Sequence, residues 1–218
     1  MENNNRLNIK NGQYEEYNKD ANEFEFHDIS EEFFSVHGLY KHVTGEDFLR
    51  MPDDVAEKTS KDVHGLNKFP AGGRIRFATD SDAVYVRMYQ GPRYTLSHVC
   101  PILACGCDVY VRDNDGKQTF KGIVFPAWDK YDIVSGKVII GAFKTEKEVV
   151  VNLPHHAEVT KVEIGVRIGS KLSLPTEYRH SKPIVYYGSS ITHGFCASRP
   201  GTTYEAIISR KYDTDYIN

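Results

Sequence analysis

Short runs of alternating apolar and polar residues, separated by turn-forming residues, recur along the chain between residues 74 and 168. The stretch GRIRFATDSDAVYVRMYQG carries Ile75 and Phe77 before the turn sequence TDSD, and Val84 and Val86 after it. Alternation of this kind is typical of strands with one buried face, and the turn residues between them favour chain reversal. The stretch therefore predicts two paired antiparallel strands.

The same pattern returns in GCDVYVRDNDGKQTFKGIVFP, where Val109 and Val111 precede DNDG. Asp115-Gly116 favours a tight hairpin turn. GCDVYV is expected to be an interior strand, because its alternating valines need a buried face. The acidic DNDG lacks the later glutamate and the ligand spacing of an EF-hand loop, so the turn interpretation is favoured over calcium binding.

Two further strands are predicted in KEVVVNLP and VTKVEIGVRIG, the second with Val162, Ile164, Val166 and Ile168 on one face. No helical period of comparable length appears before residue 172. Many short strands separated by turns predict a mainly β protein, with a jelly-roll-like antiparallel β-sandwich over residues 20–172. The first thirty residues are polar and acidic, which predicts a loose or edge-like start to the fold, with residues 1–20 as a flexible N-terminus.

The pattern changes after residue 172. KLSLPTEYRHSKP contains two prolines and suits a linker over 173–183. The run IVYY after Pro183 is typical of a buried parallel strand. Thr202 and Glu205 have capping-box spacing before a helix to about Tyr212, and DYIN begins another strand. Residues 183–218 are thus expected to form the first β–α–β unit of an incomplete α/β domain.

Composition narrows the classes of partner. The 218 residues are 40% hydrophobic, enough for a sizeable core, and 27 basic against 30 acidic residues leave a net charge of −3. Because the basic and acidic residues nearly balance, the chain has no strong positive charge to attract nucleic acid or an anionic membrane, and neither is an expected partner. The start MENNNRLNIKNG lacks the apolar core of a signal peptide, and no run approaches the eighteen or so apolar residues of a membrane span. A cytoplasmic protein is expected, and the sequence gives no indication of an oligomeric state.

Four cysteines are too few to indicate a disulfide framework. Cys100, Cys105 and Cys107 are close together but include no C-x-x-C pair, and Cys105 and Cys107 alternate within a strand-like run. We expect no bound metal and no cofactor.

The stretch YYGSSITHGF, residues 186–195, is typical of a strand that ends in a turn presenting a serine to solvent. Gly188 gives the backbone freedom just before Ser189 and Ser190, and a helix follows. A nucleophilic serine needs such a place, with backbone N–H groups facing the developing oxyanion. Taken alone, however, the same residues are more typical of a Gly/Ser turn that joins a strand to a helix.

YYGSSITHGFCASRPGTTYEAIISRKY resembles the first sequence block of the SGNH (GDSL-type) hydrolases, in the branch with G-S-S-I-T-x-G followed by A-S-R-P-G. GCDVYV and GGRIRFATDS resemble the G-x-D-L-Y β-sandwich that precedes the catalytic domain in that branch, with Val109 in place of leucine. The resemblance implies that Ser190 is the nucleophile and that its own N–H is an oxyanion donor. Gly188 and Gly194 match the same block, and Ser189 stands where the better-known motif has aspartate.

The resemblance also implies further oxyanion donors and a D-x-x-H base in later blocks, and these blocks do not occur among the 218 residues. The chain as given is therefore expected to be nearly or wholly inactive. His193 is the only histidine after Ser190, and it is interpreted as an exposed loop residue rather than a base. His155 and His156 are interpreted as a solvated strand connection with no role.

The leading hypothesis is the N-terminal part of a serine esterase that removes small acyl groups, particularly acetyl, from carbohydrate esters. The alternative is a non-catalytic carbohydrate-binding or structural β-sandwich module, in which exposed rings, Trp128 among them, would stack on sugars. Exposed coplanar rings would favour binding, and buried rings would favour a structural role.

Overall fold

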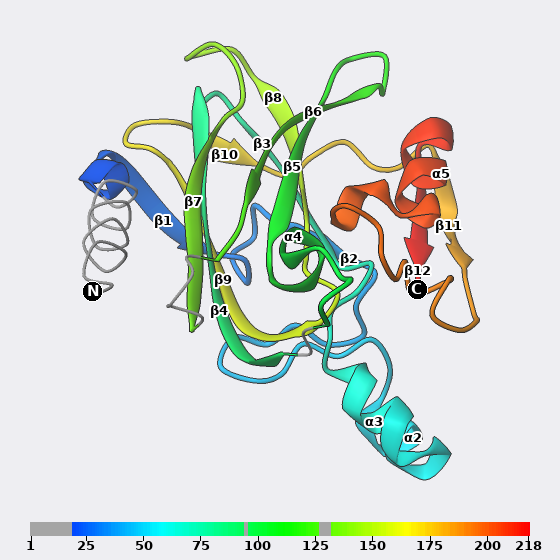
Figure 1. The fold of residues 1–218 in the computed structure, drawn as a ribbon. Coiled ribbons are helices and arrows are strands. Elements are labelled where there is room, and N and C mark those ends of the chain that lie inside the picture. The colour runs from blue at the N-terminus through cyan, green and yellow to red at the C-terminus, as the bar shows by residue number, and fades with distance from the viewer. Residues whose placement is uncertain (1–18, 94–95, 127–131) are drawn as a thin grey trace, which may run out of the picture.

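The computed structural model describes residues 19–93, 96–126 and 132–218. Within these ranges twelve strands dominate, with a few short helices (Figure 1). The elements in chain order are η1 Lys19–Glu23, β1 Phe24–Asp28, β2 Ser35–His37, α2 Asp53–Thr59, α3 Lys61–Asn67, β3 Arg74–Thr79, β4 Ala83–Arg93, α4 Pro101–Cys105, β5 Cys107–Arg112, β6 Gln118–Val124, β7 Ile133–Ile139, β8 Lys147–Asn152, β9 Ala157–Arg167, β10 Leu172–Ser173, β11 His180–Val185, η2 Pro200–Thr202, α5 Tyr204–Tyr212 and β12 Thr214–Ile217. Most of the predicted N-terminal segment 1–20 lies outside the described residues.

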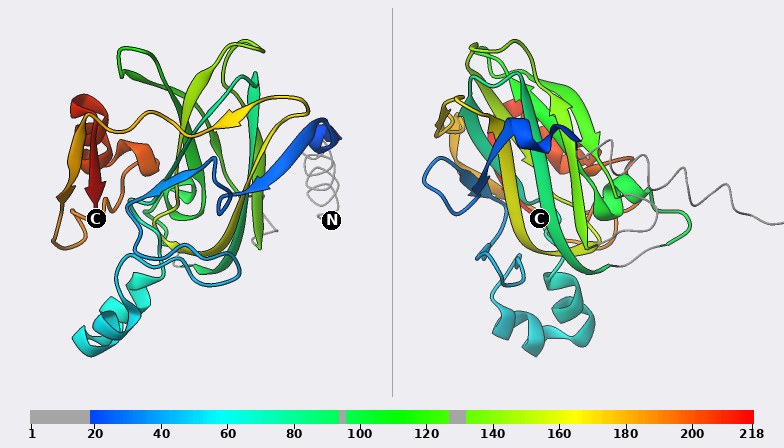
Figure 2. Two further views of the ribbon diagram at one scale, coloured as in Figure 1. Left: turned by 180° about the vertical axis from the view of Figure 1, so that it is seen from behind. Right: turned by 90° about the vertical axis from the view of Figure 1, so that its left-hand side faces the viewer.

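Two antiparallel sheets pack face to face, which confirms the predicted mainly β class (Figure 2). One sheet has the order β1-β9-β4-β7, and the other has the order β10-β3-β8-β5-β6, with β2 also paired to β3. The inward-facing apolar side chains of both sheets form one core, and each contributes roughly 1.5–3 kcal/mol through burial. The core includes Ile75, Phe77, Val84, Val86, Met88, Val109, Val124, Val134, Val149, Val151, Val162, Ile164 and Val166.

The predicted pairing of 74–79 with 83–93 is wrong, although both segments are strands. β3 pairs with β8 in one sheet, and β4 pairs with β7 and β9 in the other. The TDSD turn therefore carries the chain across the sandwich. Ser81 fixes this corner, because its Oγ donates to Ala83 O (2.6 Å) and accepts from Arg167 N (3.1 Å). Periodicity identifies strands but does not identify their partners.

The second predicted hairpin is confirmed. β5 and β6 pair antiparallel around the DNDG turn, in which Gly116 has a φ of 82°. The Asp113 carboxylate accepts hydrogen bonds from the N–H groups of Asp115 (3.1 Å) and Lys117 (2.9 Å), as expected for an Asx-type turn. β5 also pairs with β8, so GCDVYV is an interior strand as predicted.

Strand β9 buries Val162, Ile164 and Val166 on one face, as predicted. The assignment of Ile168 to that face is wrong, because the strand ends at Arg167 and Ile168 is 64% exposed. β1, paired only with β9 in the described structure, forms the edge of its sheet. This agrees with the expected edge-like start.

The short helices are features that the sequence patterns did not predict. α2 and α3 project from one end of the sandwich (Figure 1), and α4 precedes β5. Cys105 ends α4 and Cys107 begins β5, so the two cysteines do not alternate within one strand as expected. No helix in the described part of the chain is long and apolar enough to cross a bilayer.

β11, α5 and β12 form the predicted β–α–β unit, with β11 and β12 parallel. β11 begins at His180, earlier than expected, and includes Pro183, which an edge strand tolerates. Its expected burial is wrong: Val185 is 67% exposed, because β12 is its only strand partner among the described residues. α5 is capped one residue later than predicted, by Thr203, whose Oγ1 accepts from Ala206 N.

The β–α–β unit packs against the sandwich rather than standing apart from it (Figure 1). The buried Arg74 guanidinium of β3 forms an ion pair with Asp215, donates to Tyr216 O (2.9 Å) and lies 3.7 Å from the centre of the Tyr216 ring. Arg112 of β5 forms a second ion pair, with Asp213 (2.7 Å). β3 is therefore covered on both faces, which explains why all its residues are buried.

Candidate active site

Ser190 lies in the turn that follows the carboxyl end of β11 and precedes α5. Ser190 is exposed, and among the described residues no side chain forms a hydrogen bond with its Oγ. Its carbonyl accepts from Phe195 N (3.0 Å), and Ser189 O accepts from His193 N (3.0 Å), which fixes the turn. This is a suitable place for a nucleophile, because the hydroxyl is accessible while its backbone is held.

The two glycines of the block are needed for steric reasons. A Cβ at Gly188 would lie 2.2 Å from Thr192 Oγ1, so the backbone there can approach Thr192 only without a side chain. Gly194 has a φ of 84°, and a Cβ there would lie 2.3 Å from Cγ2 of Thr203, the N-cap of α5. Gly194 thus joins the serine turn to the start of the helix.

Replacing Gly194 by alanine should lower the free energy of unfolding by roughly 2–4 kcal/mol, since strain at positive φ and a clash add together. Gly45→Ala is the matched control: its φ of 87° is nearly the same, but nothing lies within 4 Å of the added Cβ. The control should lose only about 1–2 kcal/mol. Urea unfolding of both variants measures this, and equal losses would contradict the close packing of Gly194 on Thr203.

Three histidines form a cluster beside the serine turn: His155 and His156 are buried, and His193 is partly buried. The interpretation of His155 and His156 as solvated is therefore wrong, since their exposed fractions are 1% and 2%. The His193 ring lies 5.5 Å from the His155 ring and 4.8 Å from the His156 ring, and His155 Nδ1 lies 2.8 Å from His193 O. Because a carbonyl only accepts, His155 carries a proton on Nδ1. The cluster joins the β8–β9 connection of the sandwich to the serine turn.

Burial keeps these imidazoles uncharged. It lowers the pKa of His155 to about 3 and that of His156 to about 4. Burial, together with the neighbouring histidines and Arg50, lowers the pKa of His193 to about 2. His193 is thus not the exposed loop residue expected, and a group with so low a pKa is a weak general base near neutral pH.

Two sequence motifs meet beside the site, a contact that sequence reasoning missed. Asp108 and Tyr110 of GCDVYV contact Arg199 and Gly201 of the SRPG segment. The motifs are 93 residues apart, from Asp108 to Gly201. GCDVYV and the SRPG segment each lie in one of the two stretches that carry the family resemblance. Their presence together in one chain is the sequence feature that could have suggested this contact.

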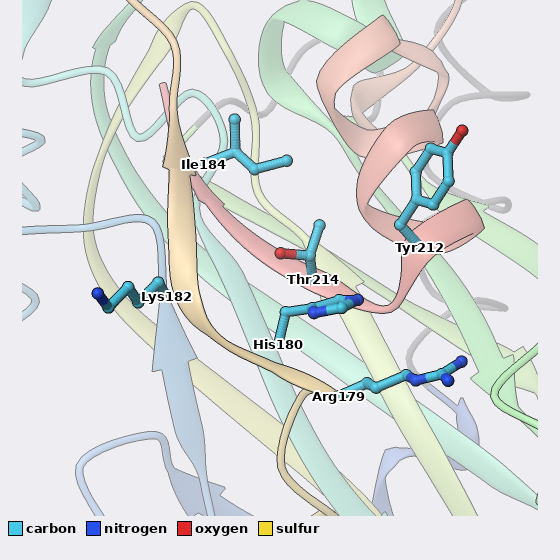
Figure 3. Close-up of a pocket in the computed structure, with 6 residues that line it drawn as sticks. All are labelled: Arg179, His180, Lys182, Ile184, Tyr212 and Thr214. Carbon is cyan, nitrogen blue, oxygen red and sulfur yellow. The ribbon is translucent and has the colours of Figure 1, made fainter.

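Two pockets lie elsewhere, the first within the β–α–β unit and the second between that unit and the β5–β6 hairpin turn. Arg179, His180, Lys182, Ile184, Tyr212 and Thr214 line the first (Figure 3). The second adjoins it and shares Arg179, His180 and Tyr212. Ser190 lines neither of them. These pockets therefore do not identify the substrate-binding site.

The cysteines show no features of a metal centre in the described part of the chain. Burial raises the pKa of both Cys105 and Cys107, which disfavours the thiolate that a metal requires. Within the described residues, no three His, Cys, Asp or Glu side chains are arranged to hold a metal ion. The absence of a bound metal stays a prediction.

Comparison with known proteins defines the class. A family model described as the N-terminus of SGNH-hydrolase-type esterases, GxDLY, matches residues 24–172. A second model, for the GDSL-like lipase/acylhydrolase family, matches residues 181–218. The two models together match nearly all of the described residues and place the chain in the SGNH/GDSL class of proteins. The chain belongs to the family with the GxDLY N-terminal domain.

Solved structures agree with this assignment. The chain is similar to a putative GDSL-like lipase from Bacteroides ovatus, with a TM-score of 0.78, 27% identity, and 89% of this chain and 56% of that chain covered. It has the fold of the salicylyl-acyltransferase SsfX3 from a tetracycline biosynthetic pathway, with a TM-score of 0.65, 24% identity, and coverages of 89% and 53%. The chain thus spans just over half the length of these proteins. No curated protein sequence gave a match.

Proposed function

We propose that this chain is part of a serine ester hydrolase in which Ser190 is the nucleophile. The observation that carries the proposal is the position of Ser190: exposed, at the carboxyl end of a parallel strand, in a turn held by close-packed glycines, within the segment matched by the GDSL-like family. Ser190 Oγ attacks the ester carbonyl carbon and its proton passes to a base. The tetrahedral oxyanion is stabilised by the Ser190 N–H, and the base returns the proton to the leaving oxygen as its bond to the carbonyl carbon breaks and the alcohol departs. Water then hydrolyses the acyl-enzyme, which releases the acid and restores the Ser190 hydroxyl.

The base is proposed to come from the full-length protein outside this chain. Of the histidines near the turn, His193 makes edge-to-face ring contacts with His155 and His156 and has a low pKa. The chain of 218 residues should accordingly show little or no turnover. The acyl group is proposed to be small, with acetylated carbohydrate as the substrate class, in line with the family resemblance.

Acyl-chain selectivity tests the proposed substrate class. The full-length protein should hydrolyse 4-nitrophenyl acetate and lose at least about tenfold in kcat/KM with the octanoate ester, because a small pocket excludes long chains. Ser190 should be the residue labelled by a fluorophosphonate, as mapped by peptide mass spectrometry. Comparable rates on acetate and octanoate would contradict the small acyl pocket without affecting the assignment of Ser190.

The alternative hypothesis is a sandwich that binds carbohydrate or has a structural role. The aromatic residues favour the structural role over carbohydrate binding. Many rings of the sandwich are buried, including Phe24, Phe77 and Tyr85, which is the outcome expected for a structural role. The exposed rings of the sandwich include Tyr40 and Phe143, from two separate loops, and Phe120 and Phe125, on β6 and just after it. The Phe120 ring is covered on one side by the Arg199 guanidinium. Trp128 lies outside the described residues.

A further inference from the structure

Asp108 is a buried carboxylate that connects three segments of the chain. It lies on β5 and is 0% exposed. Its Oδ1 accepts from Asn152 Nδ2 of β8 (2.8 Å), and its Oδ2 accepts from Gly201 N (2.8 Å). The same Oδ2 lies 3.3 Å from Arg199 Nε. Both oxygens are therefore occupied, one by the sandwich and one by the segment between the serine turn and α5.

The segment 199–201 fits closely onto the sandwich at this point. A Cβ at Gly201 would lie 2.7 Å from Asp108 Oδ2 and 2.6 Å from the Tyr110 ring, so only glycine allows the N–H to reach the carboxylate. Arg199 lies over the Phe120 ring, with Cζ 4.2 Å from the ring centre, and its Nη2 donates to the Tyr110 hydroxyl (3.4 Å). The backbone of this segment is thus clamped by β5 and β6.

Close packing continues from this clamp to the serine turn. Two residues after Gly201, Thr203 caps α5 and contacts Gly194. Gly194 N donates to Ile191 O (3.0 Å), and Phe195 N donates to Ser190 O (3.0 Å). The links in this path are backbone hydrogen bonds, a helix cap and contacts that tolerate no added atom. A displacement of segment 199–201 is therefore expected to displace the serine turn.

We propose that Asp108 is a positioning residue for the reaction, holding the Gly201 N–H so that the turn presents the hydroxyl and N–H of Ser190 in reactive geometry. This inference rests on the proposed function of Ser190. It assigns a role to the sandwich: the β5 strand supplies the anchor of the nucleophile turn.

The energetics favour a positional role over a stabilising one. Burial is the largest influence on the Asp108 carboxyl and raises its pKa to about 6, against the effects of Asn152, Gly201 and Arg199. A buried carboxylate gives little net stability, whereas its loss leaves donors without an acceptor. The carboxylate accepts from two donors on opposite sides. A neutral amide cannot replace it, because its NH₂ group would face one of them.

The experiment exchanges the carboxylate and the amide between the two strands. In Asp108→Asn, one of the two donors, Asn152 Nδ2 or Gly201 N, loses its acceptor. In the double variant Asp108→Asn with Asn152→Asp, the amide now on β5 can donate to the carboxylate now on β8 and still accept from Gly201 N. Asp80→Asn is the control: Asp80 is a buried sandwich carboxylate whose partners, Lys171 N (2.8 Å) and Lys144 Nζ (3.6 Å), lie outside the β–α–β unit.

In the full-length protein, Asp108→Asn should lower kcat for 4-nitrophenyl acetate about 10- to 100-fold with KM changed less than about threefold. The double variant should recover kcat to within about fivefold of wild type, and Asp80→Asn should retain it. In the 218-residue chain, hydrogen exchange at the Gly201 amide and the amides of 190–195 should accelerate in Asp108→Asn and be slowed again in the double variant. Tyr110→Phe, a milder change in the same clamp, should show smaller shifts of the same sign.

An unchanged kcat in Asp108→Asn despite faster exchange at Gly201 would overturn the proposal, as would a double variant that restores exchange but not kcat. If Asp108→Asn does not fold, Tyr110→Phe decides by the same two readouts. Failure of the proposed function would be recognised separately. In that case the full-length Ser190→Ala variant would hydrolyse 4-nitrophenyl acetate as fast as the wild type. The exchange measurements on the 218-residue chain do not depend on that turnover.

Discussion

Replacing Ser190 by alanine should abolish hydrolysis of 4-nitrophenyl acetate by the full-length protein, lowering kcat by at least about 10³-fold. Removal of the hydroxyl leaves no atom to form the acyl-enzyme, and only binding and the oxyanion donors can then assist water. The backbone of the turn should persist, because its hydrogen bond at residue 190 comes from the carbonyl, which accepts from Phe195 N. KM should therefore change little, so the loss falls on kcat.

The neighbouring serine provides the matched control. Ser189 is also exposed and contributes its carbonyl, as acceptor of His193 N, to the same turn. Ser189→Ala removes an equivalent hydroxyl one residue away and should retain kcat within a factor of about five. Fluorophosphonate labelling should likewise be lost in Ser190→Ala and kept in Ser189→Ala. The assignment of the nucleophile would be wrong if the two variants lost activity equally, or if Ser190→Ala retained it.

Local sequence patterns predict those parts of the fold that local physics decides. The DNDG turn closes the β5–β6 hairpin because Asp113 accepts from the chain immediately after it and Gly116 takes a positive φ. The β–α–β unit could be predicted because the apolar run IVYY indicates a strand and the later apolar residues, up to Tyr212, have helical spacing. The serine turn follows from a motif whose Gly188 is needed within the turn itself.

Long-range contacts decide what the patterns cannot. β3 has the pattern of half a hairpin, yet its outward face is covered by Tyr178 and Tyr216 from distant segments, with the Arg76 guanidinium 4.0 Å from the Tyr178 ring centre. The dipeptide His155-His156 is polar and follows a proline, a pattern that favours solvent exposure. The serine turn covers it instead, through the contact of His155 Nδ1 with His193 O. The sequence next to either segment carries no information about these distant partners.

The histidine cluster should make the folded state unstable in acid. His155, His156 and His193 have pKa values of about 3, 4 and 2 in the fold, below the ordinary histidine value of 6.5. Between about pH 6.5 and 4 the unfolded chain therefore binds more protons at these sites than the folded chain does. The stability they contribute is fully present above pH 6.5 and is lost as the pH falls. Each histidine contributes a slope of up to about 1.4 kcal/mol per pH unit.

Other ionisable groups modify this slope without removing it. Arg50 is a cation that opposes the protonation of all three histidines in the fold. Burial raises the pKa of Asp108 to about 6 and also raises the pKa of Glu205. At mildly acidic pH the folded chain therefore binds extra protons at these carboxyls, which opposes the effect of the histidines. Between about pH 6.5 and 5 the unfolded chain is expected to bind about one to two more protons than the folded chain. The free energy of unfolding should therefore fall by roughly 1.5–3 kcal/mol for each pH unit of acidification.

A single substitution isolates the contribution of the cluster. Gln cannot be protonated, so His156→Gln should reduce the slope of unfolding free energy against pH by up to about 1.4 kcal/mol per unit below about pH 6.5, whatever its effect at about pH 7.5. His180→Gln is the control, because His180 is exposed on β11 and outside the cluster. Urea unfolding followed by circular dichroism at several pH values between about 7.5 and 5 gives the slopes for the three proteins. A wild-type stability that stays level across this range, or a His156→Gln slope equal to that of His180→Gln, would show that the buried cluster does not couple protonation to folding.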